Sequence, residues 1–305
     1  MKIYSGFEDK RVARRARSAA VGIFDGVHRG HQKILRKVLS DARRLKTRSL
    51  AVTFEPHPNK ILRPGDPHPI LMSLQHRLRF FEKMGLAETL VIRFTKRFAQ
   101  ITREGFLKKL LGRLGVRTLA VGHDFRFGHR GEGDTRFLRE RSRKLGFRLS
   151  VIPAFRHGRE IISSTRIRRL IERGDLKKAG EMLGRPVSVY GTVVRGRGRG
   201  KTLGFPTANL NPHHETLPRA GVYAVWGLLD GRTLKGVVHI GARPTFGESD
   251  KSVEVHFLNF HGALYGRELE LIFVRRLRPI RRFKSREFLV RAIRRDAAQA
   301  LRILG

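Results

Sequence analysis

Two histidines, His28 and His31, lie three residues apart at the end of the segment GIFDGVHRGH. An apolar run precedes this segment and an amphipathic helical pattern follows it. Gly26 and Gly30 allow the backbone to turn tightly beside a ligand. The start of a helix offers unpaired N–H groups and the positive end of the helix dipole, which suit a phosphate. The histidines could therefore stabilise the charge that develops on a phosphoryl group during an in-line displacement.

The same pair of histidines has two other interpretations. Both rings could face one metal ion, but no third ligand is evident and the chain has no cysteine to supply a thiolate. The side chains could also be solvent-facing residues at a helix start. The neighbouring glycines favour the phosphate site.

The segment VRGRGRGKTLGFPTANL contains GKT at residues 200–202 and could be mistaken for a P-loop. Counting excludes that motif, because the first glycine of GxxxxGKT would fall at Arg195 and Pro206 interrupts the helix that should follow. A glycine- and arginine-rich tract could instead bind RNA, but this leaves GFPTAN unexplained. Thr207 and Asn209 offer hard oxygen atoms two residues apart, so a strand would present both to Mg²⁺ on one face.

Glu254 stands in a run of alternating apolar residues, between Val253 and Val255. A carboxylate in such a strand must find a polar partner, face solvent or take part in chemistry. The pattern alone favours an exposed glutamate on a strand.

The first half of the chain alternates short apolar runs with helical patterns, which predicts a Rossmann-like parallel α/β sheet with ligands beyond the carboxyl ends of its strands. The clearest helical stripe runs from Ile34 to Leu45. The apolar runs end at Phe24, Phe54, Phe94, Phe125 and Pro153.

After a basic helix expected over residues 165–183, short strands separated by Gly, Pro and Asn turns predict a small antiparallel barrel or sandwich. The last segment returns to helix, with Ser285 as a candidate N-cap. We place the boundary near Met182 to Pro186, which gives one domain over residues 1–184 and another over residues 185–305.

The chain carries 65 Lys and Arg against 26 Asp and Glu, a formal net charge of +39. This excess raises the local concentration of any anion, and we expect nonspecific nucleic-acid binding at low salt as a side effect. Disulfide frameworks and cysteine nucleophiles are excluded because there is no cysteine. We see neither a signal peptide nor an apolar run that could span a bilayer, and we expect a cytoplasmic protein.

Four segments in order resemble the prokaryotic bifunctional riboflavin kinase/FAD synthetase family: GIFDGVHRGH, TFEPHP from Thr53, GHDFRFG from Gly122 and ISSTRIR from Ile162. The resemblance implies a nucleotidylyltransferase domain in which the FMN phosphate attacks the α-phosphorus of ATP, so that pyrophosphate leaves and FAD forms. His28 and His31 would be catalytic there. The ATP site that it implies consists of Gly22, Phe24, Asp25, Gly26, His28, His31, Asp124, Ser164, Thr165 and Arg168.

The segment GFPTAN resembles the kinase signature of the same family, which implies phosphorylation of riboflavin to FMN with ATP and Mg²⁺. Glu254 would then be the catalytic base for the terminal ribityl hydroxyl. Thr207 and Asn209 would hold the metal. The nucleotide-binding residues that the resemblance implies are Gly196, Gly200, Lys201, Thr207 and Asn209.

The chain departs from the family pattern at three positions. Ile23 and His239 stand where asparagine is common, and Lys201 stands where arginine is usual. Because isoleucine cannot donate the side-chain hydrogen bond of an asparagine, one alternative is a monofunctional riboflavin kinase with a degenerate first domain. Another alternative is a basic RNA-binding protein.

Overall fold

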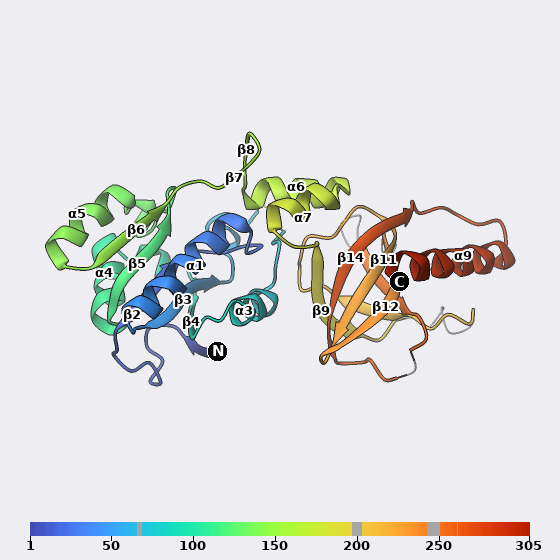
Figure 1. Cartoon of the computed structure of the whole chain (residues 1–305), viewed down its shortest axis with the longest axis horizontal. Coiled ribbons are helices and arrows are strands. Elements are labelled where there is room, and N and C mark those ends of the chain that lie inside the picture. Colours follow the sequence, from blue (N-terminus) through green and yellow to red (C-terminus); the bar gives the residue numbers. More distant parts are fainter. Residues whose placement is uncertain (66–68, 197–202, 243–250, 261) are drawn as a thin grey trace. The chain divides into compact units, whose positions relative to one another are not determined.

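The computed structural model describes residues 1–65, 69–196, 203–242, 251–260 and 262–305 (Figure 1). The chain folds into two compact units. The first comprises Met1–Ile70 and Leu74–Ser164, and the second comprises Leu71–Ser73 and Thr165–Gly305. None of the helices in these described ranges combines the length and the apolar character needed to cross a bilayer.

The first unit is built on a six-stranded sheet in the order β1-β4-β3-β2-β5-β6, and every neighbouring pair is parallel. This confirms the Rossmann-like expectation. The edge strand β1 was not expected, because its pattern of exposure gives no apolar run. The strands are β1 (Lys2–Ser5), β2 (Arg17–Val21), β3 (Arg48–Glu55), β4 (Glu88–Arg93), β5 (Val116–Gly122) and β6 (Arg148–Ile152).

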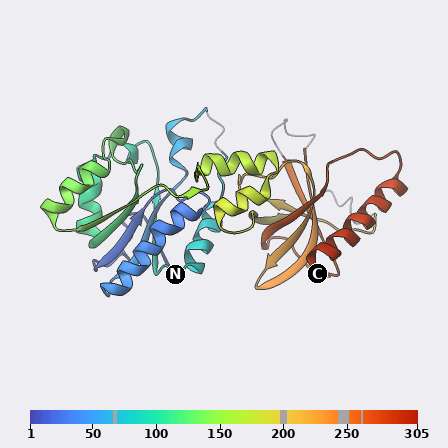
Figure 2. The same ribbon diagram turned by 45° about the horizontal axis from the view of Figure 1, so that its top comes forward.

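Helices lie on both faces of this sheet (Figures 1 and 2). Helix α1 packs on β2, β3 and β5 and buries the predicted stripe that includes Ile34, Leu35 and Val38. Phe106 and Leu110 belong to the hydrophobic cluster that also contains Ala19 and Val21 of β2. The helical segments are α1 (Arg29–Arg44), α2 (Pro58–Leu62), α3 (Leu74–Lys83), η1 (Phe98–Gln100), α4 (Arg103–Lys108), η2 (Lys109–Arg113), η3 (His129–Gly131) and α5 (Thr135–Leu145), and a small hairpin, β7 (Arg156–His157) and β8 (Glu160–Ile161), follows β6.

The strand order changes direction between β2 and β5, which are neighbours in the sheet. Ligands of open α/β sheets bind at such a point, beyond the carboxyl ends of the strands. The segment GIFDGVHRGH follows β2, and GHDFRFG begins at the end of β5. The topology therefore brings two of the expected motifs to one edge of the sheet.

The single basic helix expected over residues 165–183 is wrong, because the chain forms two helices there, α6 (Ser164–Arg173) and α7 (Leu176–Leu183). Gly174 adopts a φ of +88°, which ends α6. Asp175 then caps α7, since its carboxylate accepts the Lys178 N–H at 3.1 Å. The periodicity carried no sign of this break, although Gly and Asp are common residues at helix ends.

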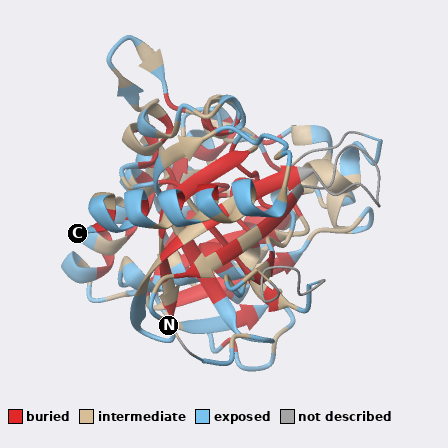
Figure 3. Ribbon diagram, turned by 90° about the vertical axis from the view of Figure 1, so that its right-hand side faces the viewer, coloured by how far each residue is buried: buried red, intermediate tan, exposed pale blue. Residues whose placement is uncertain are grey.

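The second unit contains a closed barrel in the order β10-β13-β12-β11-β14-β9, and its paired strands are antiparallel. This confirms the expected barrel with a terminal helix. Figure 3 shows buried residues in the strands and exposed residues on the outer helix faces. The elements are β9 (Ser188–Val194), β10 (Ala208–Asn211), β11 (Gly221–Leu229), β12 (Arg232–Ala242), β13 (Lys251–Phe257), β14 (Glu268–Arg278) and α9 (Arg286–Leu304).

Ser285 stands at the N-cap position of α9 with extended backbone, as expected. Its hydroxyl donates to the Glu287 carboxylate rather than accepting a backbone N–H. The helix packs on β11, β12 and β14, where Ala300 and Leu304 meet Ala224.

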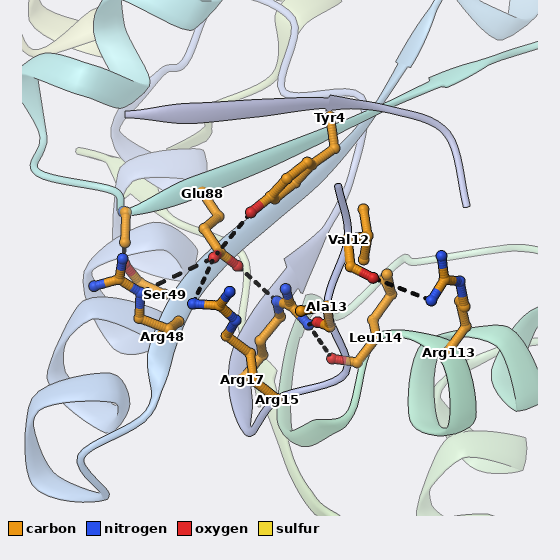
Figure 4. A network of polar contacts seen from close by, with 11 residues as sticks. Tyr4, Val12, Ala13, Arg15, Arg17, Arg48, Ser49, Glu88, Arg113 and Leu114 are labelled. Atoms are coloured by element: carbon orange, nitrogen blue, oxygen red, sulfur yellow. Dashed lines mark hydrogen bonds and ion pairs between the residues drawn. The ribbon is translucent and has the colours of Figure 1, made fainter. Parts of the chain in front are cut away.

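A buried ion pair ties the amino ends of the central strands together (Figure 4). The Arg17 guanidinium donates to Glu88 at 2.6 Å, and neither residue is exposed to solvent. Tyr4 donates to the same carboxylate at 3.3 Å, and Arg17 also donates to the carbonyl of Leu114 at 2.6 Å. The pair thus connects β1, β2, β4 and the start of β5.

We expect Glu88→Gln to destabilise the first unit by about 3–5 kcal/mol, because it leaves the Arg17 charge buried without its counter-charge. Unfolding in urea followed by far-UV circular dichroism measures the loss. The single tryptophan, Trp226, lies in β11, so its fluorescence follows the second unit in the same experiment. The matched control is Glu82→Gln, because Glu82 is an exposed carboxylate that pairs with the N-terminal amine. The effect of this substitution should stay within about 1 kcal/mol. Equal effects of the two substitutions would contradict the assignment.

Candidate functional site

The loop between β2 and α1 is sharply turned. Phe24, Gly26 and Val27 have φ values of +54°, +81° and +38°, in the region that non-glycine residues rarely adopt. The side chains of Phe24 and Val27 are fully buried, and the Phe24 ring packs edge to face on Phe81 of α3. The buried side chains therefore hold the backbone of this loop in a strained form beside the start of α1.

His28 and His31 come together at the start of α1. Their rings are stacked with centroids 3.6 Å apart, and the His28 Nδ1 accepts the backbone N–H of His31 at 3.3 Å. His28 is thus the N-cap of the helix, and its neutral form carries its proton on Nε2. Gly30 leaves room for this arrangement, since a Cβ there would come within 3.2 Å of the His28 ring. The structure brings together the two histidines that the spacing predicted.

Arg77 is a residue of this site that the sequence did not indicate. It lies on α3 and is almost fully buried, and its guanidinium donates to the carbonyl of Ile23 and, at 3.3 Å, to that of Phe54. It also pairs with Glu55 at 3.1 Å. Burial lowers the pKa of Arg77, while Glu55 and Asp25 oppose that shift. Arg77 thus fixes the carboxyl ends of β2 and β3.

Ile23 works through its backbone as well as its side chain. Its carbonyl accepts from Arg77 and from the Thr53 hydroxyl, the latter at 3.1 Å. Its side chain packs on the core of the first unit. An isoleucine at this position therefore keeps the loop anchored without a polar side chain.

The other predicted residues of the first site lie on several elements. Asp25 is buried, and its carbonyl accepts the Ser164 hydroxyl at 2.9 Å. Asp124 follows β5, and its side chain is 83% exposed, so it is accessible at the edge of the sheet. Gly22 continues β2, since its N–H donates to Val52 at 3.1 Å. Thr165 and Arg168 lie on α6 in the second unit, and Arg168 is buried.

In the barrel, three polar residues lie side by side on adjacent strands. Asn209 of β10 pairs in register with Glu254 of β13, and Glu254 pairs with His239 of β12. Val253 and Val255 are buried on the other face of β13, so the three polar side chains share the outer face of the barrel. The structure thus brings Glu254 and Asn209 together, as predicted, and adds His239.

The segment GFPTAN is held at both of its ends. The carbonyl of Pro206 lies 2.8 Å from the His256 Nδ1, and Phe205 packs edge to face on the same ring. Gly196 lies against Asn209, because a Cβ at Gly196 would come within 1.9 Å of the Asn209 amide nitrogen. The sequence did not indicate His256, although its place two residues after Glu254 puts it on the same face.

Strand β10 begins at Ala208, so Thr207 lies one residue before it rather than within it. Gly200 and Lys201, the other two predicted residues of the nucleotide loop, lie outside the described residues. Helix α9 is fixed beside this face of the barrel by Arg278, which donates to Asp296 at 2.8–3.0 Å.

Among the described residues, no three His, Asp or Glu side chains gather at a spacing that could hold a metal ion. A third ligand for a zinc site at His28 and His31 is therefore not found in this part of the chain. The oxygen atoms of Thr207 and Asn209 suit a hard cation such as Mg²⁺, which takes much of its shell from water and substrate phosphates.

Two family models match the chain, FAD synthetase over residues 10–166 and riboflavin kinase over residues 183–304. A protein of Escherichia coli K12 named bifunctional riboflavin kinase/FMN adenylyltransferase is 37% identical over 287 residues, which cover 93% of this chain and 92% of that protein. The chain belongs to this bifunctional family. A Pseudomonas fluorescens protein of the same name is 35% identical and covers 98% of this chain, with 97% of its own length matched.

A solved structure from Streptococcus pneumoniae, described as a macrolide-efflux protein, has a TM-score of 0.85 to this chain and is 27% identical. The match covers 98% of this chain and 99% of that one. The FAD synthetase model covers the segments GIFDGVHRGH and GHDFRFG, which follow β2 and β5. The riboflavin kinase model covers the whole barrel and α9.

We expect Arg77→Met to loosen the loop between β2 and α1 in this member of the bifunctional family. The loss of charge-assisted hydrogen bonds worth about 1.5–3 kcal/mol should speed backbone amide exchange over residues 22–28 by about 10-fold or more. Hydrogen–deuterium exchange followed by mass spectrometry measures this. The control is Arg36→Met on the exposed face of α1, which should leave exchange in the loop unchanged. If exchange in the loop is the same in both variants, Arg77 does not anchor it.

Proposed function

We propose that this chain carries out the two reactions of its family at separate sites, with the adenylyltransferase in residues 1–184 and the kinase in residues 185–305. The chain is a bifunctional riboflavin kinase and FMN adenylyltransferase, as both family models and the relatives indicate. The observation that supports the proposal is that each matched region contains its own cluster of predicted residues, the stacked His28 and His31 in the first and the opposed Asn209 and Glu254 in the second. The FAD synthetase match ends at residue 166 and the riboflavin kinase match begins at residue 183, which is compatible with the proposed limits.

In the adenylyltransferase site, a phosphate oxygen of FMN attacks the α-phosphorus of ATP, and the bond to pyrophosphate breaks, which yields FAD. The His28 Nε2–H and the N–H groups at the start of α1 would donate to the phosphates, because they stand at the positive end of the helix. His31, stacked on His28, would be the second donor. Ser164, Thr165 and Arg168 would bind the triphosphate.

The remaining residues of this site have a shaping role in the proposal. Phe24 and Asp25 are buried, so they would act through the loop backbone beside Gly22 and Gly26. Asp124, exposed at the carboxyl end of β5, would frame the nucleotide. The anchored carbonyl of Ile23 supports a functional first site rather than a degenerate one.

In the kinase site, the terminal ribityl hydroxyl of riboflavin attacks the γ-phosphorus of ATP. Its proton passes to the Glu254 carboxylate, the bond to the β-phosphate oxygen breaks, and FMN and ADP result. Gly196, Gly200 and Lys201 would form the nucleotide loop. Thr207 and Asn209 would hold Mg²⁺, which supplies charge neutralisation at the phosphates when bound.

The two alternatives gain no support from the comparisons. A degenerate first domain is not favoured, since the FAD synthetase model matches residues 10–166. An RNA-binding protein is not favoured, since both halves match enzymes. Nonspecific nucleic-acid binding at low salt, motivated by the net charge of +39, and a cytoplasmic location stay predictions.

We expect Glu254→Gln to abolish FMN formation from riboflavin, because the amide cannot accept the hydroxyl proton, while FAD formation from added FMN is spared. His28→Ala should do the reverse, with a loss of about 100-fold or more in adenylylation. Chromatography of the flavins, with riboflavin or FMN as the substrate and with ATP and Mg²⁺, measures both. Circular dichroism controls for folding. If either substitution removes both activities from a folded protein, the assignment of separate sites is wrong.

The charge on the surface gives a further expectation. Affinity for a single-stranded RNA should fall by about 10³-fold or more between 50 and 200 mM salt, because binding releases counterions without base-specific contacts. Fluorescence anisotropy with two RNAs of unrelated sequence measures the slope. Binding that persists at 200 mM salt for one sequence alone would contradict a nonspecific interaction.

A further inference from the structure

Glu254 is flanked by a different polar residue on each of its neighbouring strands. Asn209 lies directly opposite it on β10, and His239 lies directly opposite it on β12. Directly opposed residues in antiparallel strands have Cβ atoms about 4.5–5.5 Å apart and project from the same face. The proposed function assigns Asn209 to the metal and phosphate side of Glu254. His239 borders the carboxylate on the other side.

The surroundings of His239 favour its neutral form. Burial lowers the pKa of His239, Arg278 adds to this effect, and Glu254 opposes it. Glu254 on β13 and Arg278 on β14 are charged groups that act on the imidazole, and Asp296 on α9 pairs with Arg278 through both of its carboxylate oxygens. At neutral pH the ring therefore carries one N–H donor and no charge.

Gly241 gives the ring its place. A Cβ at Gly241 would come within 2.6 Å of the His239 Cε1, so any other residue there would displace the imidazole. His239 and Gly241 lie two residues apart on β12 and so share the outer face. The ring therefore lies along β12, over Gly241 and beside the strand that carries Glu254.

We propose that His239 is a positioning residue of the kinase reaction, which holds the Glu254 carboxylate toward the ribityl hydroxyl. This inference rests on the proposed role of Glu254 as the base. A carboxylate on the outer face of a barrel has several rotamers, and only some direct an oxygen at the substrate. A neutral imidazole restricts those rotamers and adds no charge beside the carboxylate, whereas a lysine or arginine at the same place would add a fixed positive charge.

The test compares His239→Ala with His239→Asn in the full-length protein. We expect His239→Ala to lower kcat of riboflavin phosphorylation by about 10-fold to 100-fold, with KM for riboflavin and for ATP changed less than about 3-fold. We expect His239→Asn to recover most of kcat, because its amide supplies a neutral N–H donor. Adenylylation of added FMN by the same samples is the internal control, and it should be unchanged. His214→Asn, in the loop after β10, is the matched histidine control.

The pH profile of kcat separates positioning from simple packing. In the wild type, acidification protonates His239, and the imidazolium beside Glu254 weakens the base, so kcat falls as the pH drops through the pKa of His239. In His239→Asn this fall should be lost or move to lower pH, because the variant has no imidazole that can become charged beside the carboxylate. Equal kcat values for wild type and His239→Ala would overturn the proposal. The proposal would also be overturned if His239→Ala and His239→Asn lost kcat equally and the fall of kcat at acidic pH stayed at the same pH. That result is expected of a residue that only packs.

Two further outcomes are assigned in advance. If Glu254→Gln retains kinase activity, the proposed function of Glu254 is wrong, whatever the His239 variants show. If the Trp226 fluorescence shows that His239→Ala destabilises the barrel, this variant is set aside. The pH profiles of kcat for the wild type and His239→Asn then decide whether His239 is a positioning residue. An identical acid limb in those two proteins overturns the proposal.

Discussion

A phosphate site at a helix start uses backbone N–H groups of a loop that has no regular hydrogen-bond ladder. Such a loop keeps its shape inside a protein when buried polar side chains bind its free carbonyl and N–H groups. In the first unit, Arg77 meets this need by donating to the carbonyls of Ile23 and Phe54. Burial of the guanidinium opposes its charge, and Glu55 and Asp25 offset that cost. The place of His28 at the start of α1 depends on this anchor, since the loop with its positive φ values begins at the same carbonyl.

The second unit positions its polar row differently, through the register of a barrel. Closure of the six strands fixes which residues oppose one another, so Asn209, Glu254 and His239 fall into one row without a dedicated loop. Residues 205–207, just before β10, are irregular, and the ring of His256 holds them at Pro206. A one-residue slip of β13 would place Glu254 inside the barrel and break the row.

Much of this architecture follows from local patterns in the sequence. Buried parallel strands appear as apolar runs, and α1 appears as a stripe with a period of 3.6 residues, so both were predictable. The runs ending at Phe24 and Phe125 extend past the strands, which end at Val21 and Gly122. The apolar residues beyond the strand ends, Ile23, Phe24 and Phe125, pack on the core or on its neighbours, and Phe24 is fully buried there.

Other features depend on contacts between distant residues and were not predictable. Arg77 and Ile23 are 54 positions apart, and nothing in the pattern of α3 distinguishes this arginine from its neighbours. The pairing of Glu254 with His239 depends on strand register, which periodicity alone does not give. The four ordered motifs marked the predicted first site and GFPTAN marked the predicted second site, but the contacts that shape both regions required the fold.

The scarcity of acidic residues gives the described carboxylates distinct roles. With 26 Asp and Glu against 65 Lys and Arg, a carboxylate readily meets a cation. Glu88 and Asp296 are buried and neutralise Arg17 and Arg278. Each of these two carboxylates is thus committed to a buried or half-buried arginine. Glu254 instead faces an amide and a histidine that favours its neutral form, across both neighbouring strands. Neither of the residues paired with it in register is an arginine or a lysine, which distinguishes it from the two carboxylates that pair with arginines.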